Sequence, residues 1–236
     1  MKKTFDIISV GDATLDVFLE ISEATVSCKL NTDDCQFCIN YADKIPVDTV
    51  TRVPGSGNAS NNAVGSSRLG MKTAIVSILG NDETGGIILD RWKKEKVGTR
   101  HVSMDRNHGT NYSTVLNFQG ERTILVYHEP RTYRFPKALG AAEWIYYTSL
   151  GKGSESMHEG LLSYIKKHDV KLAFQPGTYQ LKLGREQLKP IFAASEIVFV
   201  NKEEAERIVE DGVRSMKDLL THLHDMGCRV AVITDG

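Results

Sequence analysis

Short apolar runs alternate along this chain with segments of helical periodicity. The runs with the pattern of buried strands are 5–10, 73–79, 144–148, 170–174, 197–200 and 229–233. The predicted helices are 59–69, a segment that starts near 82 and includes 87–92, 156–168, 183–194, 202–209 and 216–226. Strands and helices in alternation imply right-handed crossovers and a mainly parallel sheet with helices on both faces. We therefore expect one doubly wound α/β domain spanning residues 1–236.

Two stretches interrupt the alternation and predict a small β lid. Residues 112–118 and 122–127 are rich in β-branched and aromatic side chains and are joined by a short glycine-containing turn, which predicts a hairpin. Residues 19–53 contain short alternating pieces that are typical of the edge strands of a flap. We place the two lid segments near 17–53 and 108–130.

Glycines and polar residues follow the carboxyl ends of the predicted strands. They are Gly11-Asp12, Gly80-Asn81-Asp82, Gly151-Lys152-Gly153, Gln175-Pro176-Gly177, Asn201 and Asp235-Gly236. Ligands of open α/β sheets bind beyond the carboxyl ends of the strands. We therefore expect these residues to form one cleft.

The segment from Pro54 to Gly85 combines a small-residue, asparagine-rich turn with the start of a helix. Gly57 permits a positive φ and the close approach of a ligand, while Asn58 and Asn61 supply amide groups. A polar small molecule is the expected ligand. Without a ligand, Asn58 would be an N-cap and Asn61 a first-turn helix residue, and both interpretations remain open.

Charge and hydropathy exclude two classes of partner. The formal net charge is -1 and no basic run is longer than a pair or so of lysines, so the chain lacks the electrostatic footprint of a nucleic-acid-binding protein. No apolar stretch approaches the roughly 18 residues that a membrane span requires. We expect neither nucleic acid nor membrane as a partner, and a cytoplasmic location.

Three of the four cysteines lie close together, as Cys28, Cys35 and Cys38, with Cys228 far away. A Cys-x-x-Cys pair could be half of a zinc site, but a structural zinc site needs four ligands and no histidine is nearby. We therefore expect no metal at these cysteines. Reduced thiols in a partly buried insertion or a subunit contact are the preferred interpretation.

Several of these motifs occur in an order that resembles the ribokinase-like (PfkB) family of carbohydrate kinases. In chain order they are the segment Gly11 to Asp16, the Gly57-x-x-x-Asn61 turn, Ala63, Gly70, Gly80, Asp82, Gly85 and the Asn201-x-x-Glu204 motif. Ser56 departs from the family pattern, which usually has a glycine there. The resemblance implies a ribokinase-like fold with a β lid, and transfer of the γ-phosphoryl group of ATP to a sugar hydroxyl with the help of Mg²⁺.

The resemblance also implies roles for particular residues. Those expected to bind the sugar are Asp12, Asp16, Gly57, Asn58 and Asn61. The Asn201-x-x-Glu204 motif would handle magnesium and phosphate, although the same two residues also fit a helix capping box. Lid strands often pair between subunits in this family, so a homodimer through the β lid is expected.

The family pattern continues beyond a segment like residues 232–236 into a Gly-Ala-Gly-Asp motif that carries the catalytic base. We therefore expect the base to lie beyond residue 236 and this chain alone to be inactive. One alternative is a non-catalytic sugar-binding or regulatory protein of the same fold. A nicotinamide-dependent dehydrogenase is disfavoured because residues 11–16 lack a Gly-x-Gly-x-x-Gly fingerprint. The identity of the sugar or nucleoside acceptor is left open.

Overall fold

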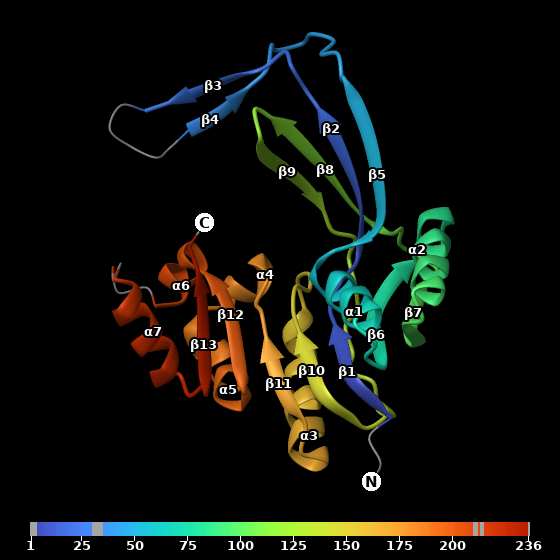
Figure 1. Ribbon diagram of the computed structural model, residues 1–236, viewed down its shortest axis with the longest axis vertical. Coiled ribbons are helices and arrows are strands. Elements are labelled where there is room, and N and C mark those ends of the chain that lie inside the picture. The colour runs from blue at the N-terminus through green and yellow to red at the C-terminus, as the bar shows by residue number, and fades with distance from the viewer. Residues whose placement is uncertain (1–3, 30–34, 210–211, 213–214, 236) are drawn as a thin grey trace.

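The structure is a computed structural model that describes residues 4–29, 35–209, 212 and 215–235. Its centre is a parallel sheet (Figure 1). In spatial order the strands are β13 (Val230–Thr234), β12 (Ile197–Asn201), β11 (Lys171–Phe174), β10 (Ala142–Tyr147), β1 (Phe5–Val10), β6 (Thr73–Gly80) and β7 (Gly98–Asp105). Every neighbouring pair is parallel, which confirms the predicted sheet.

Helices cover both faces of this sheet, as predicted. The helical elements are α1 (Asn58–Arg68), α2 (Glu83–Lys94), η1 (Ser154–Met157), α3 (His158–His168), α4 (Thr178–Leu181), α5 (Arg185–Ala194), α6 (Lys202–Val209) and α7 (Met216–Asp225). Small residues such as Ala59 and Ala63 let α1 pack closely on the sheet, in one core cluster with Trp92 of α2. None of the helices in the described residues is long and apolar enough to cross a membrane.

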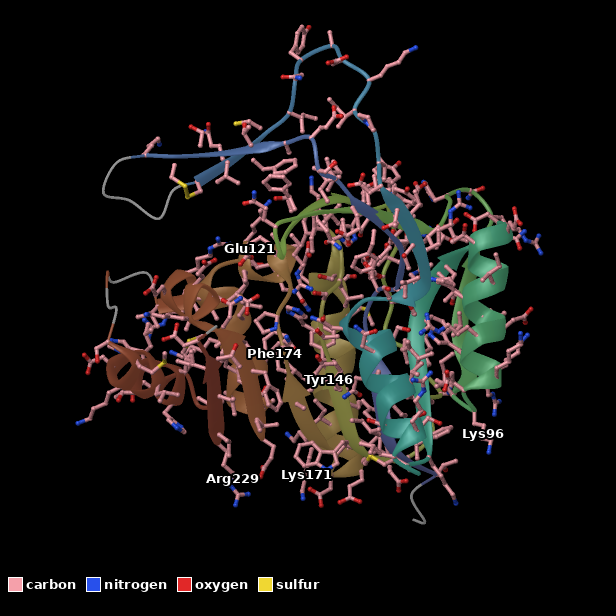
Figure 2. The ribbon with its side chains drawn as sticks, turned by 45° about the horizontal axis from the view of Figure 1, so that its top comes forward. Lys96, Glu121, Tyr146, Lys171, Phe174 and Arg229 are labelled. Carbon is pink, nitrogen blue, oxygen red and sulfur yellow. A yellow bond between two sulfur atoms is a disulfide. The ribbon has the colours of Figure 1, made fainter. Side chains whose placement is uncertain are left out.

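The larger core cluster joins α3 and α5 to the sheet. Phe174 of β11 is fully buried, stacks on Tyr147 of β10 at 5.6 Å between ring centroids, and meets Phe192 of α5 edge-on at 5.5 Å. Figure 2 places Phe174 inside the layers, whereas Lys171 and Arg229 lie at the edge of the sheet remote from the lid. Aromatic contacts therefore fix the strands whose carboxyl ends face the lid.

A second sheet stands beyond the carboxyl ends of the central strands (Figure 1). It contains β5 (Thr49–Ser56), β2 (Thr14–Glu20), β8 (Asn111–Phe118) and β9 (Glu121–Tyr127) in that order. The predicted hairpin is the antiparallel pair of β8 and β9. A separate small hairpin, β3 (Thr25–Cys28) with β4 (Cys35–Cys38), extends from the same region. Together these strands form the lid.

Two strands differ from the sequence-based expectation. β2 begins at Thr14, so the first lid segment starts before its predicted bound near residue 17 and includes Asp16. β7 was not predicted at all, since its sequence GTRHVSMD is mostly polar and its residues are only half-buried at the sheet edge. Continuous apolar runs mark buried parallel strands, and edge strands lack that signal.

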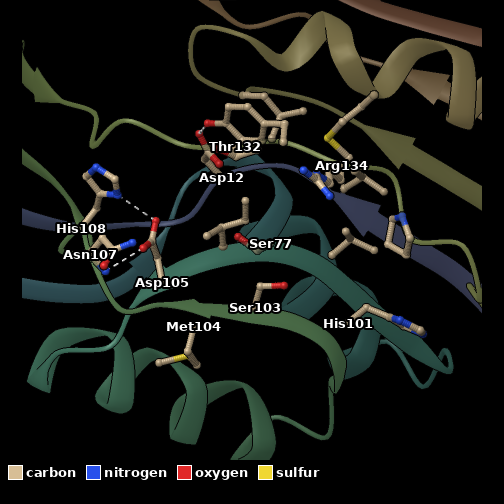
Figure 3. A pocket seen from close by; sticks show the side chains of 17 residues that line it. Asp12, Ser77, His101, Ser103, Met104, Asp105, Asn107, His108, Thr132 and Arg134 are labelled. Carbon is tan, nitrogen blue, oxygen red and sulfur yellow. Dashed lines mark hydrogen bonds and ion pairs between the residues drawn. The ribbon is translucent and has the colours of Figure 1, made fainter.

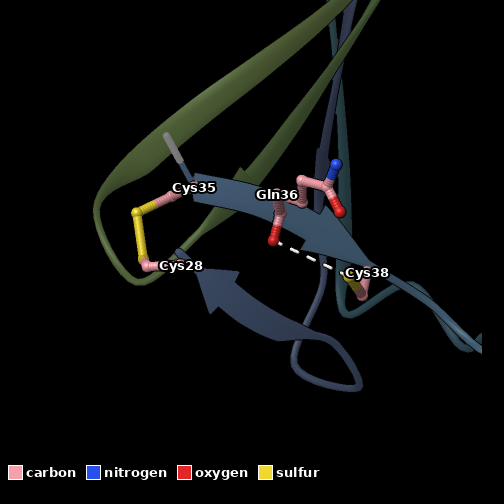
Figure 4. Close-up of a disulfide and its surroundings, with 4 residues drawn as sticks. All are labelled: Cys28, Cys35, Gln36 and Cys38. Atoms are coloured by element: carbon pink, nitrogen blue, oxygen red, sulfur yellow. Dashed lines mark hydrogen bonds between the residues drawn. A yellow bond between two sulfur atoms is a disulfide. The ribbon is translucent and has the colours of Figure 1, made fainter. Parts of the chain in front are cut away.

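The expectation of reduced thiols is wrong for two of the cysteines. Cys28 and Cys35 form a disulfide across the β3–β4 hairpin (Figure 4). Antiparallel pairing sets these two residues opposite each other, with 4.0 Å between their Cα atoms. Cys38 and Cys228 are free. The pairing depends on how two strands meet, which the cysteine spacing did not reveal.

Candidate functional site

A cavity of about 400 Å³ lies between the lid and the carboxyl ends of the central strands, and we call it the lid cavity. Its walls are the turn from β1 to β2, the start of α1, parts of β8 and β9, the loop after β10, and α4. The chain runs outward from β1 in both directions along the sheet, to β6 on one side and β10 on the other. Such switch points are where α/β sheets bind ligands.

Asp12 lies at the base of the lid cavity and is only 5% exposed. Its Oδ2 accepts hydrogen bonds from the Tyr133 hydroxyl at 2.6 Å and from the Gly151 N–H at 3.0 Å. Burial and the neighbouring Asp12 carboxylate both raise the pKa of Tyr133, which keeps its hydroxyl a donor. The Oδ1 atom of Asp12 is buried and has no partner among the described residues.

Asp16 faces the same cavity from lid strand β2. It pairs with Val53 of β5 and Ser113 of β8, so the lid sheet fixes its position. Burial raises the pKa of Asp16 above its ordinary value, and the nearby hydroxyls of Ser113, Ser56 and Thr14 only partly oppose this. Its Oδ1 is also buried without a partner among the described residues. The carboxylate is therefore incompletely solvated and ready to accept hydrogen bonds.

Gly57 and Asn58 complete the wall at the start of α1. Gly57 is the N-cap with φ 97°, and a Cβ there would lie 2.9 Å from the backbone oxygen of Asp12, so only glycine fits. The N-cap interpretation of Asn58 is therefore wrong; its Nδ2 instead donates to the Thr148 hydroxyl at 3.4 Å.

Asn61 is exposed and is not among the residues that line the cavity. Its role in sugar binding stays a prediction.

The motif residue Asp82 acts at a distance from the cavity. Its Oδ2 accepts from the Thr110 N–H at 2.7 Å, and its Oδ1 accepts from the Thr110 hydroxyl and the Gly85 N–H, each at 2.7 Å. Burial would raise the pKa of Asp82, but these hydrogen bonds and the charge of Arg131 hold it below its ordinary value. The carboxylate thereby fixes Thr110, and with it the next residue, Asn111.

Sequence reasoning missed Asn111 and His128, which both line the lid cavity. Asn111 accepts from the Glu129 N–H through Oδ1 at 3.0 Å, which leaves its Nδ2 buried and unpaired among the described residues. Nδ1 of His128 is likewise buried without a hydrogen bond, 3.8 Å from Asp12 Oδ2. Each residue lies directly beside a strand of the predicted hairpin. That position is the one feature of the sequence that could have identified them.

Four lid-cavity residues thus carry a buried polar atom with no hydrogen-bond partner among the described residues. The atoms are Asp12 Oδ1, Asp16 Oδ1, Asn111 Nδ2 and His128 Nδ1. Buried polar atoms are nearly always hydrogen-bonded in folded proteins. Unpaired acceptors and a donor on residues that line one cavity suit a ligand with several hydroxyl groups, which can both donate and accept.

A second cavity of about 380 Å³, the sheet-face cavity, shares Asp12 with the first (Figure 3). Its main polar cluster is already paired: Asp105 accepts from the Asn107 N–H, His108 and Arg131 at 2.9–3.1 Å. The Asn107 hydrogen bond and these neighbours lower the pKa of Asp105 to about 2. Because its acid is satisfied by protein groups, this cavity is the weaker candidate for a polar ligand.

Asn201 and Glu204 lie outside both cavities, at the end of β12. The Glu204 N–H donates to Asn201 Oδ1 at 2.8 Å and the Asn201 N–H donates to Glu204 Oε2 at 2.9 Å, which is the predicted capping box. Burial raises the pKa of Glu204. The other carboxylate oxygen of Glu204 takes no part in the capping box. It suits contact with a magnesium ion through water better than direct coordination, because Mg²⁺ usually keeps several of its waters.

The predicted strand ends do not all line the lid cavity. The ends of β1, β10 and β11 meet at the lid cavity, through Asp12, Ser149 and Thr178. The ends of β12 and β13 meet each other instead, with Lys202 Nζ 3.8 Å from Asp235 Oδ2. In the sheet, β11 and β10 lie between β12 and β1, and the expectation of one cleft stays a prediction.

Comparisons with known proteins point to one family. The model described as "pfkB family carbohydrate kinase" matches residues 19–236. An ATP-dependent 6-phosphofructokinase of Thermoanaerobacterium thermosaccharolyticum is 24% identical over 247 residues, which cover 99% of this chain and 70% of that protein. The probable fructokinase-5 of Arabidopsis thaliana is 25% identical over 201 residues, which cover 78% of this chain and 61% of that protein. The chain therefore spans less than two thirds of this second relative.

Solved structures show the same fold. The structure of Arabidopsis thaliana ribokinase complexed with ribose and ATP matches 97% of this chain and 71% of its own, with 17% identity and a TM-score of 0.72. Halothermothrix orenii fructokinase matches 98% of this chain and 80% of its own, with 19% identity and a TM-score of 0.72. At these identities the similarity establishes the architecture, lid included, and leaves ligands to be argued from this chain's own residues.

Proposed function

This chain belongs to the pfkB family of carbohydrate kinases, and on that premise we propose that the lid cavity binds the sugar acceptor of an ATP-dependent phosphoryl transfer. The family resemblance drawn from the sequence motifs is thereby confirmed. The chain would supply the sugar-binding part of a phosphotransferase that acts on a sugar hydroxyl. Fructose and ribose are natural first ligands to test, because relatives are named as fructokinases and a ribokinase.

The observation that four residues lining the lid cavity each carry an unpaired buried polar atom supports this proposal. Sugar hydroxyls would donate to Asp12 Oδ1 and Asp16 Oδ1 and would accept from Asn111 Nδ2, so each buried atom gains a partner. An unpaired buried polar group costs about 1–3 kcal/mol. Binding a sugar removes that cost, whereas an apolar ligand of the same size would leave it in place.

Two properties of this site would favour transfer of the phosphoryl group to the sugar. Fixed carboxylate and amide partners hold a hydroxyl in one orientation, which raises its effective concentration at the phosphorus. The lid over the cavity excludes water, which would otherwise compete as an acceptor. In this proposal Asp12 and Asp16 orient the sugar. None of the described residues is assigned the role of catalytic base.

In the same proposal, Asn201 and Glu204 take part in binding ATP and Mg²⁺. The free carboxylate oxygen of Glu204 would hold water molecules of a hydrated Mg²⁺, which neutralises phosphate charge when it is bound. The capping box keeps both side chains at the start of α6. ATP as phosphoryl donor agrees with a cytoplasmic location, although a disulfide such as Cys28–Cys35 is uncommon in that compartment.

A homodimer through the lid belongs to the same proposal. All residues of β9, the last strand of the lid sheet, are exposed; Ile124, Val126 and Tyr127 line the lid cavity, whereas Leu125 does not. An edge strand with an exposed apolar side chain such as Leu125 would gain stability by pairing with a second copy. Sedimentation velocity of the wild type against a Leu125→Glu variant would measure the association.

Calorimetry tests the sugar site directly. The 236-residue chain is titrated with fructose and ribose, as wild type, as Asp16→Asn, and as Asp90→Asn, which alters an exposed carboxylate on α2. We expect sugar binding by the wild type and Asp90→Asn and none by Asp16→Asn. No binding of either sugar, or equal binding by Asp16→Asn, would refute the proposal. Turnover with added ATP and Mg²⁺ would support a kinase, whereas binding without turnover would favour the non-catalytic sugar-binding alternative.

A further inference from the structure

Arg131, in the connection from β9 to β10, has no exposed side-chain surface. Its Nη1 donates to Asp105 Oδ2 at 3.0 Å, and its Nη2 donates to the backbone oxygen of Gly109. Charged side chains are almost never fully buried unless they are paired. Asp105 is the last residue of β7 in the central sheet, whereas Gly109 lies just before β8 of the lid. The buried guanidinium therefore joins the lid to the sheet.

The peptide group between Gly109 and Thr110 is held at both of its polar ends. Its oxygen accepts from Arg131, and its N–H donates to Asp82 Oδ2 at 2.7 Å. Hydrogen bonds to charged groups are stronger than those between neutral groups. Gly80 packs against the same peptide group, because a Cβ on Gly80 would lie 2.3 Å from the carbonyl carbon of Gly109. We call this group the clamped peptide.

The clamped peptide directly precedes Asn111, the first residue of β8 and a residue that lines the lid cavity. Asn111 Oδ1 accepts from the Glu129 N–H at 3.0 Å, and Asn111 Nδ2 is buried without a partner among the described residues. Glu129 belongs to the same connection as Arg131, two residues earlier. This connection thus holds Asn111 twice, through the backbone before it and through its side-chain oxygen.

We propose that Arg131 is a positioning residue for the sugar, because its guanidinium fixes the clamped peptide and thereby places Asn111 Nδ2 as a donor to a sugar hydroxyl. This inference rests on the proposed function and adds to its sugar site a residue that does not line the lid cavity. Without Arg131 the peptide oxygen would lose its charged partner, and Gly109 permits more backbone conformations than any other residue type would. The orientation of the clamped peptide would then no longer be fixed.

Calorimetry with fructose and ribose measures the effect of Arg131 on sugar binding. Arg131→Met removes the charge and both hydrogen bonds, and we expect it to weaken binding about tenfold, the size of one hydrogen bond. Arg131→Lys should fall between Arg131→Met and the wild type, because it keeps the charge but loses the forked geometry of the guanidinium. Arg134→Met, at an exposed arginine of the same connection, is the matched control and should bind as the wild type does.

A double-mutant cycle tests whether Arg131 acts through Asn111. Asn111→Ala should by itself weaken binding about tenfold, because it removes the donor that Arg131 places. Arg131→Met added to Asn111→Ala should then cause no further loss of affinity. A general effect of Arg131 on the fold would instead give the same fold-loss in both backgrounds, and that result would overturn the inference. Urea unfolding establishes that each variant is folded, and if Arg131→Met is not, Arg131→Lys takes its place in the cycle.

The outcomes separate this inference from the proposed function. Wild-type sugar affinity in folded Arg131→Met, or in Arg131→Lys where only that variant folds, would overturn the inference and leave the sugar site standing. Failure of the wild type to bind either sugar would overturn the proposed function, and this inference with it. Weaker binding by the Arg131 variants that disappears in the Asn111→Ala background would support both.

Discussion

Alanine at Gly85 and at the adjacent Gly86 should have opposite effects on stability. A Cβ on Gly85 would lie 2.1 Å from the backbone oxygen of Gly80, whereas a Cβ on Gly86 would meet nothing within 4 Å. Ordinary contact begins at 3.4 Å, so Gly85→Ala forces a displacement of 1.3 Å between α2 and the end of β6. Overpacking of this kind costs about 1–3 kcal/mol. Gly86→Ala should stabilise α2 by about 0.5–1 kcal/mol, because alanine is the better helix former.

The displacement at Gly85 should also reach the lid cavity. The Gly80 N–H donates to the Thr110 hydroxyl at 3.1 Å, and Thr110 precedes the cavity residue Asn111. Urea unfolding followed by circular dichroism gives both stabilities, and sugar titration gives the binding constants. We expect Gly85→Ala to lose stability and sugar affinity together and Gly86→Ala to keep its affinity. Equal stability of the two variants would refute the close-packing argument.

Two further substitutions test how the carboxylates are held. Burial raises the pKa of Asp16, so the folded state prefers it protonated and its stabilising contribution is lost as pH rises above the ordinary value of 3.8. Asp16→Asn should therefore raise the free energy of unfolding at neutral pH, with a gain that vanishes below pH 3.8, and a gain that does not depend on pH would contradict this. Tyr133→Phe should cost about 1–2 kcal/mol in urea unfolding because Asp12 Oδ2 keeps only the Gly151 N–H, while Tyr41→Phe, at a fully exposed residue, should change nothing.

Local signals in the sequence predicted most of the central sheet and helices. β1 was predicted with its observed bounds of 5–10 and α6 with its observed bounds of 202–209, since an apolar run and a cap are both local features. β7 was missed because a half-buried edge strand needs no continuous apolar run. The Cys28–Cys35 disulfide was missed because it depends on how β3 and β4 pair.

Residues of the candidate site were likewise predicted where their signal is local and missed where it depends on distant segments. Asp12 and Gly57 were found because a strand end and a glycine turn are visible in a few adjacent residues. Asn111 has no local signature: Asp82, which lies 28 residues before Thr110, holds the neighbouring backbone in place. His128 reaches the cavity because the β8–β9 hairpin folds back over it. Such positions follow from pairing between distant segments.

The unpaired atoms of the lid cavity also indicate which part of the fold would select the sugar. Asp12 lies in the turn after the central strand β1, whereas Asp16, Asn111 and His128 lie on or directly after lid strands. The sheet therefore offers one fixed acceptor, and the lid offers the remaining acceptor and the amide donor. If a sugar occupies this cavity, the lid strands would determine which sugar fits, while Asp12 would fix the hydroxyl nearest the sheet. Substitutions in β2 and β8 should then change acceptor preference, and those around Asp12 should weaken all sugars alike.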